Sequence, residues 1–519
     1  MSRDFDAVVI GGSADGIVAA AVLARAGQRV LVLEAECEPG GTLREFEFAP
    51  KFRAAPLAPD LGHVDALVLR ATGAVLPAAI APDSCAIALG HGTPLALGRS
   101  IAATTAGLKK FSVRDAAAWP AFAAEMHALA GFLGELFRRP ALQVDGKGAG
   151  EMLSLAGLGL RYRALGRHGM TELLRTLPMA LTDLLDDWFE SDRLKGLLAA
   201  IGVADLPQGP AGGGTALAFL HRHVGAAPGV FGERLRLQTD GAAFVTALAE
   251  RARAAGAQIE NNAAVRRLVV RDDRIAGVEA ASGEQIGCRS VVSAVDPQFT
   301  LLELLDPIHL DTEFIDAVRH VRHRGVTSHV LLGLNGLPAI PGPADAPAGA
   351  LWIAPSVRHV ERAYDAAKYG SNSDEPVVEL RFPSVTQPNL APAGMHVATL
   401  RVQYTPWQLR DGDWTRARDA MADRAIAAVE RQVPGLTSRI VQRAVLTPVD
   451  LETRFGLREG AVSRGEVALD QLLFMRPVAG WSRHAMPVPG LYLCGAGTHP
   501  GPGLTGLSGL LAARAVQAA

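Results

Sequence analysis

Glycines and one acid near the start of the chain have the spacing of a dinucleotide site. Gly11, Gly12 and Gly16 follow an apolar run, and Glu34 comes 18 residues after Gly16. In such a pattern the first glycine permits a tight turn and the last permits close packing of a helix, whose free N–H groups hold a pyrophosphate. The later acid would bind the hydroxyls of an adenosine ribose. The middle position of this fingerprint is normally glycine but is Ser13 here, so the phosphates must tolerate a side chain or shift slightly.

The residues around these glycines predict the elements that position them. Residues 7–10 are apolar and β-branched, which is typical of a buried parallel strand. A helix is expected over residues 17–26, with Gly27 at its C-cap and a second strand over residues 30–33. Strand, helix, second strand and terminal acid are in register, which favours dinucleotide binding over a βαβ unit that holds no phosphate.

A second glycine-rich stretch lies near the other end of the sequence. Residues 490–506 read as a strand, a glycine-rich loop and the start of a helix, roughly 480 residues from the first such pattern. Just after Glu34, the pair Gly40 and Gly41 lets the backbone pass close to a bulky cofactor. An NAD enzyme would resume regular βα alternation here, whereas residues 45–110 read as irregular segments and short strands. The pattern suggests one long cofactor held from both ends of the chain.

Composition narrows the class of protein. The chain has 519 residues, which exceeds the usual size of one hydrophobic core, so two or three domains are expected. Hydrophobic residues make up 49% and charged residues 20%, as in a globular enzyme with a large interior. The net charge of −2 gives no reason to expect nucleic acid as a partner.

Cysteine usage and hydropathy bear on the cellular compartment. The four cysteines are scattered without a CxxC pair, so neither a disulfide framework nor a metal site is expected. The first strand begins too early to leave room for a secretory signal, and no run of 18 apolar residues suggests a membrane span. We expect a reduced, cytoplasmic protein that is soluble or at most membrane-peripheral.

The middle of the chain leaves the first fold and returns to it. A helical region is expected over residues 112–137 and 150–205, and another helix over 241–255. Short strands then lead into the apolar run 290–297, which returns the chain to a β-sheet. Such a return implies a discontinuous cofactor domain into which the substrate region is inserted. Residues 300–455 mix helices and strands.

Several longer motifs resemble those of one flavoprotein superfamily. They are QPNLAPAGMHV at 387–397, QYTP at 403–406, TPVDLE at 447–452, FGL at 455–457 and GLYLCG at 490–495. Residues 216–221 and 291–297 fit the same template, so the resemblance covers nearly the whole chain. On these motifs the chain resembles the phytoene desaturase-like branch of the amine oxidase and phytoene desaturase superfamily of FAD-dependent oxidoreductases.

The resemblance implies an α/β fold: a discontinuous Rossmann-like FAD-binding domain with an inserted α+β substrate domain. The FAD-binding domain would comprise residues 1–75, 235–298 and 460–519, and the substrate domain residues 76–234 and 299–459, helix-rich in its first part. Val265 would meet the adenine through its backbone. The cofactor-binding residues implied by the resemblance are Gly11, Gly12, Ser13, Asp15, Gly16, Glu34, Ala35, Gly40, Gly41, Thr42, Leu43, Val265, Gly495, Gly503, Leu504 and Thr505.

The family's activity implies hydride transfer from a hydrophobic substrate, of the polyene or isoprenoid kind, to the flavin. Dehydrogenation, desaturation and isomerisation all remain open, and we nominate no catalytic residue because direct hydride transfer requires no protein acid or base. Ser13, Asp240 and Arg464 depart from the family's usual residues; Arg464 stands where a histidine is usual. These departures motivate the alternative of a degenerate flavoprotein scaffold with a protein partner. An NAD-linked dehydrogenase is a third hypothesis, which leaves the C-terminal glycine loop without a role.

Four further features each have a functional and a structural interpretation. His221 and His223 would lie on one face if their segment were a strand, and could then bind a metal, but no third ligand is in sight and they are expected to be structural or to line the substrate site. The basic run 319–324 fits a helix C-terminus better than an anion site. His499 could reach the flavin or shape its loop. The leucines of residues 153–184 suggest either membrane contact or, as we expect, buried helix packing.

Overall fold

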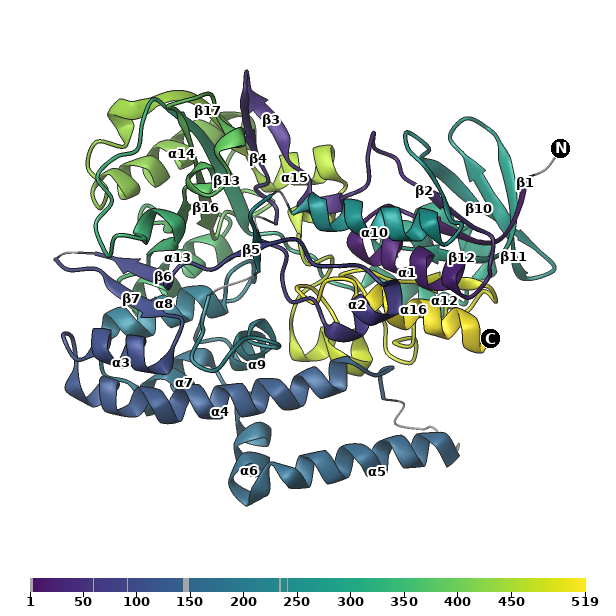
Figure 1. Cartoon of the computed structure of the whole chain (residues 1–519), viewed down its shortest axis with the longest axis horizontal. Coiled ribbons are helices and arrows are strands. Elements are labelled where there is room, and N and C mark those ends of the chain that lie inside the picture. The colour runs from purple at the N-terminus through teal and green to yellow at the C-terminus, as the bar shows by residue number, and fades with distance from the viewer. Residues whose placement is uncertain (1–2, 59, 91, 143–148, 233–234, 240) are drawn as a thin grey trace.

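The computed structural model describes residues 3–58, 60–90, 92–142, 149–232, 235–239 and 241–519. Figure 1 shows a sheet with its helices at the right, a second sheet with its helices at the upper left, and a layer of helices below. Both ends of the chain lie at the first sheet. The mixed α/β class and the Rossmann-like first unit confirm the expected fold class.

The first sheet has seven strands in the order β10-β11-β12-β1-β2-β9, with β18 paired to β12. Five of these strands run parallel to one another: β9, β2, β1, β12 and β18. In this part of the sheet, Val9 lies opposite Val32 on one side and Val292 on the other. The apolar strands are buried on both faces, as a parallel sheet requires. The strands are β1 (Arg3–Ile10), β2 (Val30–Leu33), β9 (Gln258–Glu260), β10 (Val265–Arg271), β11 (Arg274–Ala280), β12 (Gln285–Ser293) and β18 (Leu491–Leu493).

Helices cover both faces of this sheet. On one face, α1 (Ala14–Arg25) lies between α10 (Ala242–Ala254) and α16 (Leu507–Ala518) and packs on Ala7 and Val9. On the other face, Val8 and Ile10 pack against Leu301 and Phe314, which come from the turns and helices that follow β12. These are α11 (Pro297–Phe299), a π-helical turn (Thr300–Leu304) and α12 (Thr312–Arg319).

The second sheet also has seven strands, in the order β17-β13-β16-β15-β14-β6-β7. Alternation along its strands separates two environments. Val378 and Leu380 face α14 (Trp414–Glu430), whereas Glu379 and Arg381 face the opposite side, toward the first sheet's loops. The strands are β6 (Ser84–Leu89), β7 (Leu95–Gly98), β13 (Thr327–Leu334), β14 (Ala350–Ile353), β15 (Val377–Arg381), β16 (His396–Gln403) and β17 (Ile440–Leu446).

A helical layer completes the second unit around a cluster of aromatic rings. Trp119 lies 5.2 Å from Phe231 between ring centroids, and Phe122 lies 4.8 Å from Phe189. The helices are α3 (Ile101–Leu108), α4 (Val113–Phe137), α5 (Ala149–Ala164), α6 (Gly166–Thr176), α7 (Leu181–Trp188), α8 (Asp192–Gly202), α9 (Thr215–Arg222) and α13 (Val357–Lys368). The helix α15 (Pro448–Phe455) packs instead on β17 of the second sheet. Smaller elements are α2 (Ala66–Thr72) and the paired strands β3 (Phe46–Ala49) with β4 (Phe52–Ala54) and β5 (Ala79–Ile80) with β8 (Arg236–Leu237).

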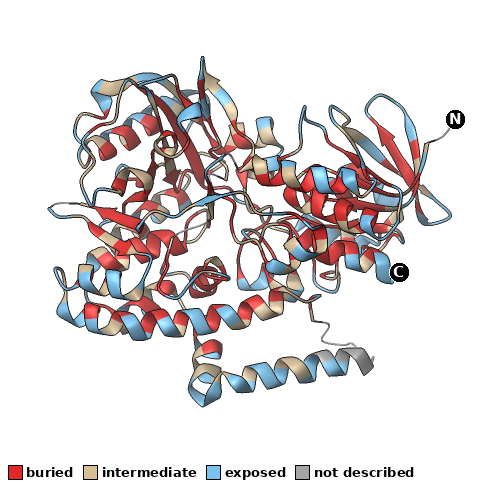
Figure 2. Ribbon diagram, in the orientation of Figure 1, coloured by how far each residue is buried: buried red, intermediate tan, exposed pale blue. Residues whose placement is uncertain are grey.

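The expectation of buried leucines holds for only part of the helical layer. Leu181 and Leu184 are buried, whereas Leu153 and Leu160 on α5 are 74% and 70% exposed. Figure 2 shows α5 mostly exposed, below the body of the protein. The prediction was wrong for α5 because its apolar residues do not form one stripe that a neighbouring helix covers. Among the helices of the described residues, none combines the length and apolar content that a membrane span needs.

Candidate active site

The turn between β1 and α1 has the geometry that its glycines predict. Gly11 has φ +95° and donates its N–H to the Leu33 carbonyl at 2.9 Å. A Cβ on Gly16 would lie 2.1 Å from the Gly11 carbonyl oxygen, so only glycine fits there. Ser13 is the N-cap of α1, with ordinary extended backbone, and its hydroxyl accepts the Gly16 N–H at 3.4 Å. Serine is therefore accommodated, but it takes one of the N–H groups that would otherwise face a phosphate.

Glu34 is fixed at the carboxyl end of β2. Its carboxylate accepts the Gly12 N–H at 2.5 Å and the Glu36 N–H at 2.8 Å. The Glu34 carbonyl accepts the Ala263 N–H at 2.8 Å, which ties the start of β10, with Val265, to the same edge of the sheet. A carboxylate accepts about four hydrogen bonds, so Glu34 can still receive two ribose hydroxyls.

The C-terminal glycine loop joins the first turn across a separation of nearly the whole chain. Asp15 accepts the Gly509 N–H at the start of α16 at 3.1 Å, and Gly495 donates its N–H to the Ser508 hydroxyl at 3.0 Å. Burial raises the pKa of Asp15 to about 6. Asp15 therefore holds α16 against α1, and its negative charge would repel a phosphate rather than bind one.

These loops surround a cavity of about 450 Å³ that extends to the second sheet. Ten of the sequence-predicted residues line it: Ser13, Asp15, Gly40, Gly41, Thr42, Leu43, Gly495, Gly503, Leu504 and Thr505. The other six lie outside its lining, at the turn and the edge of β2: Gly11, Gly12, Gly16, Glu34, Ala35 and Val265. The structure thus places the proposed flavin side in the cavity and the proposed adenosine side beyond it.

A series of alternating charges runs along the wall of the cavity that the second sheet provides. We call it the charge ladder; its members in order are Arg236, Asp60, Arg381, Glu379, Arg401, Asp205 and Arg222. Arg236 Nε lies 3.0 Å from Asp60 Oδ1, Arg381 Nε 2.6 Å from Glu379 Oε1, and Arg401 Nη1 3.0 Å from Asp205 Oδ2. All but Arg236 line the cavity.

The ladder keeps Asp60 and Glu379 ionised although both are buried. The neighbouring Arg381 and Arg236 guanidinium groups outweigh desolvation and lower the pKa of Asp60 to about 2. Arg381 and Arg401 likewise lower the pKa of Glu379, and the two acids raise the pKa of Arg381. Sequence inspection missed this feature because its members come from strands, loops and a helix far apart in the chain, and each alone looks like an ordinary surface charge.

A second unforeseen residue is Arg476, which is 2% exposed. Its guanidinium donates to the carbonyls of Ser463 at 2.6 Å, Glu466 at 2.9 Å, Gln471 at 3.1 Å and Ala496 at 2.7 Å. Because Ala496 belongs to the C-terminal glycine loop, Arg476 fixes the segment 463–466 to that loop. Arg476 and Pro477 also resemble a motif of the flavoprotein superfamily named above, which was the only sign in the sequence that this position matters.

Comparisons with known proteins identify the family. Residues 9–61 match the model "NAD(P)-binding Rossmann-like domain", and residues 109–517 match "Flavin containing amine oxidoreductase". The chain belongs to the flavin-containing amine oxidoreductase family. It is an FAD-dependent oxidoreductase, as the resemblance implied.

Similar proteins extend over most of the chain. "Pyridine nucleotide-disulfide oxidoreductase domain-containing protein 2" of Rattus norvegicus is 32% identical, covering 99% of this chain and 94% of the relative. A limonene dehydrogenase polypeptide of Castellaniella defragrans is 27% identical over the same shares, and the lycopene-forming phytoene desaturase of Pseudescherichia vulneris is 29% identical over 49% of each chain. Among solved structures, putrescine oxidase bound to putrescine has a TM-score of 0.60 at 14% identity, with 100% of this chain and 99% of that chain covered. An oxidoreductase of Methanosarcina mazei has a TM-score of 0.60 at 15% identity, with 99% of this chain and 100% of that chain covered. Both show a shared fold.

The residues present fit FAD. The free N–H groups of α1 begin at the cavity, and a Cβ on Gly503 would meet nothing within 4 Å, so this part of the loop borders open space. Glu34 would hold the adenosine ribose, the turn at Gly11–Gly16 the pyrophosphate, and the residues from Gly40 to Leu43 and Gly495 to Thr505 the flavin half. These individual contacts stay predictions.

The other candidates have structural roles. His221 lies in the helix α9 and His223 just after it, so the strand that would put both on one face does not form; residues two apart point to different sides of a helix. His223 is buried with its Nδ1 2.6 Å from the Phe219 carbonyl, and burial lowers its pKa to about 4, whereas His221 lines the cavity. No group of three potential metal ligands occurs in the described parts of the chain.

Two more alternatives are decided by contacts. His499 Nε2 lies 2.9 Å from the Arg139 carbonyl and the ring packs on Phe137, so it shapes the loop and does not line the cavity. The basic run starts at the C-terminus of α12, as expected: Arg319 is in the last turn, and His320 Nδ1 lies 2.6 Å from the Asp316 carbonyl. Arg322 and Arg324 lie beyond the helix and pair with Glu466. Asp240, one of the departures from the family pattern, lies outside the described residues.

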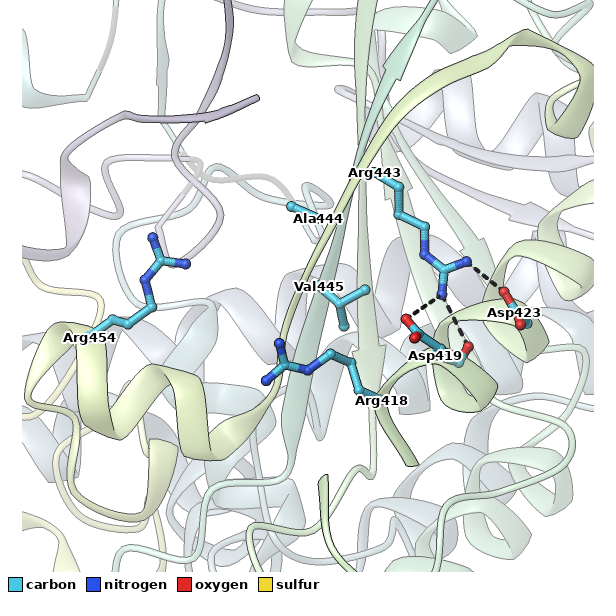
Figure 3. Close-up of a pocket in the computed structure, with 7 residues that line it drawn as sticks. All are labelled: Arg418, Asp419, Asp423, Arg443, Ala444, Val445 and Arg454. Carbon is cyan, nitrogen blue, oxygen red and sulfur yellow. Dashed lines mark hydrogen bonds and ion pairs between the residues drawn. The ribbon is translucent and has the colours of Figure 1, made fainter. Parts of the chain in front are cut away.

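A separate hollow on the outer surface carries no comparable chemistry. It lies between α14, β17 and α15, and Figure 3 shows Arg443 turned toward Asp419 and Asp423. Arg443 donates to Asp423 at 2.6 Å, and both side chains are solvent-accessible. None of the predicted cofactor residues borders this hollow, and its open ion pairs provide matched surface controls for the cavity residues.

Proposed function

We propose that this oxidoreductase removes hydride from an apolar segment of a polyene- or isoprenoid-type substrate, in a dehydrogenation, desaturation or isomerisation. The observation that carries the proposal is that the flavin-side loops share one cavity with a group of apolar side chains. These apolar side chains come from several elements: Leu57, Ile201, Leu206, Val224, Val230, Leu235, Trp352, Val462 and Val467. Relatives whose names specify limonene dehydrogenation and phytoene desaturation support this substrate type.

The chain's own residues would bind and orient the substrate and exclude water. The apolar residues of α8 and α9 hold the segment that reacts, and FAD, when bound, supplies the hydride acceptor. Arg401, a member of the charge ladder, lies over the Trp352 ring at 5.4 Å from its centroid, so the ladder borders the apolar part of the cavity. A buried ion-pair series is costly where apolar residues would serve, so we propose that a polar end of the substrate lies against it.

The test is an anaerobic titration of the purified, FAD-containing protein. The probes are phytoene, geranylgeraniol, geranylgeranoic acid and, as a contrast, putrescine. Loss of the visible flavin band with an apolar probe, together with a product two hydrogens lighter or an isomer of the probe, is expected. Reduction by putrescine but by none of the isoprenoids would replace the proposal with amine oxidation. A colourless protein that cannot be reconstituted with FAD would favour the scaffold alternative.

A matched control changes the turn between β1 and α1, where we predict that the pyrophosphate binds. Gly16→Ala should abolish FAD binding, because its Cβ would overlap the Gly11 carbonyl. Any product formed by this variant at the wild-type rate would show that the activity comes from a contaminant and would remove the support for the proposal.

A further inference from the structure

Arg464 is a cation that the fold places in the cavity without giving it a partner. Its side chain lines the cavity, and within the described residues it makes no hydrogen bond or ion pair. The charge of Asp296 acts on Arg464, but the two form no ion pair. Asp296 instead accepts the Gln298 N–H at 2.8 Å through Oδ1, and its Oδ2 lies 3.0 Å from His323 Nε2. Burial lowers the pKa of Arg464, which shows that its surroundings do not solvate the charge as water does.

The backbone is arranged to hold Arg464 where it is. Its φ of +49° is in the left-handed region, which is uncommon for a residue other than glycine. The Arg464 N–H donates to the Ala461 carbonyl at 3.1 Å, and Arg476 binds the carbonyls on either side, from Ser463 and Gly465. A strained and anchored backbone that presents an unpaired guanidinium to a cavity indicates that an anion enters there.

The order of strands indicates which anion this is. In a doubly wound sheet the ligand lies across the carboxyl ends of the strands. Glu34 marks the adenosine end on β2, and Gly11 to Gly16 mark the pyrophosphate at β1. The next carboxyl ends are those of β12 and β18, where Ala294 and Gly495 line the cavity together with Arg464. Arg464 thus lies on the flavin side of the pyrophosphate.

We propose that Arg464 faces the flavin half of FAD and stabilises the negative charge of the reduced ring. A hydride brings two electrons and one proton to flavin N5, and the resulting anionic charge resides around N1 and the C2 carbonyl. A neighbouring guanidinium favours this form over the neutral oxidised ring. The role depends on FAD binding, but not on the substrate class proposed above.

The experiment measures the bound flavin without any substrate. Arg464→Gln removes the charge, Arg464→Lys keeps it, and all three side chains impose the same backbone strain. The control is Arg443→Gln, which removes a surface arginine that, unlike Arg464, is paired to aspartates. The first readout is the midpoint potential. The second is the dissociation constant for sulfite, whose lone pair forms a bond to N5 of the oxidised flavin and shifts an electron pair to the same N1 region.

For Arg464→Gln we expect the reduced state to be disfavoured at least tenfold, which lowers the potential by about 30 mV, and sulfite to bind at least tenfold more weakly. Arg464→Lys should retain most of both values, and Arg443→Gln all of them. Wild-type potential and sulfite affinity in Arg464→Gln would overturn the assignment. So would equal losses of affinity for oxidised and reduced FAD, since these would place the guanidinium on the pyrophosphate.

If Arg464→Gln does not fold, Arg464→His provides the same test within one protein. Its charge is removed as the pH rises from about 5.5 to 8.5 around the ordinary histidine pKa. We expect the potential of this variant to fall more steeply with pH than that of the wild type over this range. Parallel pH profiles would overturn the proposal.

Discussion

Replacing Arg476 by methionine should show how strongly this one side chain holds the segment 463–466 against the C-terminal glycine loop. The four carbonyls it binds at 2.6–3.1 Å belong to Ser463, Glu466, Gln471 and Ala496, and the guanidinium is buried. Methionine has a similar volume but no donors, so each carbonyl loses its partner in place. At about 1–2 kcal/mol for each acceptor left without a donor, the expected loss of unfolding free energy is about 4–8 kcal/mol.

The assay combines urea unfolding, followed by far-UV circular dichroism, with titration of the apo-protein by FAD. Arg476→Met should also weaken FAD binding, because Ser463 and Ala496 line the cavity and would no longer be held together. Arg476→Lys keeps the charge and three donors but lacks the planar guanidinium, so its unfolding free energy and its FAD affinity should lie between those of the wild type and Arg476→Met. Arg443→Met, which breaks exposed ion pairs, should cost about 0–1 kcal/mol. A loss below about 1 kcal/mol in Arg476→Met, with unchanged FAD affinity, would refute this reasoning.

Three further predictions concern the turn between β1 and α1 and the charge ladder. Gly16→Ala should abolish FAD binding in a titration, whereas Gly27→Ala, whose Cβ meets nothing within 4 Å, should lower the unfolding free energy by only about 1 kcal/mol. The pKa of Asp15 is raised to about 6, and an adjacent pyrophosphate favours the protonated carboxyl. The affinity for FAD should therefore fall as the pH rises through about 6. Asp15→Asn should remove this pH dependence. The pKa of Asp60 is lowered to about 2, so its ion pairs should contribute about 2 kcal/mol at neutral pH that is lost as the pH falls from about 4 to 2; urea unfolding of the wild type and Asp60→Asn at both ends of this range measures it.

Each of these has a contradicting result. Equal FAD affinities of Gly16→Ala and Gly27→Ala would mean that the turn does not hold the cofactor. A wild-type FAD affinity that does not change with pH would show that Asp15 is far from the pyrophosphate. An Asp60→Asn variant whose stability difference from the wild type is the same at both ends of the acid range would show that the ladder does not depress the pKa of Asp60.

The first sheet could be predicted from the sequence because its signals are local. The β-branched run before Gly11, the Gly27 cap and the acid at Glu34 lie within a few turns of one another, and each agrees with the others. At His221 and His223 the two-residue spacing left open whether a strand puts both on one face, because spacing alone does not reveal that the flanking residues form α9. Local patterns failed on α5, because leucine content does not reveal whether another element covers a helix.

The wall of the cavity could not be predicted from local patterns. Asp60 and Arg381 are 321 positions apart and meet only because the loop after β4 crosses the second sheet. On β15 the alternation of Val378, Glu379, Leu380 and Arg381 is typical of a strand with a solvated face. The sequence does not show that this face is turned toward the flavin loops, so a substrate chamber lined with charges looked like an ordinary exterior.

The bond between Asp15 and the start of α16 has a consequence for how the protein is made. The donor and acceptor are 494 positions apart in the chain. At a synthesis rate of 5–20 residues per second, the helix that completes the cofactor site emerges about 25–100 s after the first turn has formed. During that interval α1 lacks the partner that buries its α16-facing side, so the nascent chain should depend on chaperones. If translation ended shortly before residue 507, the released chain would contain most of its residues but would lack α16, and its cofactor site would be incomplete.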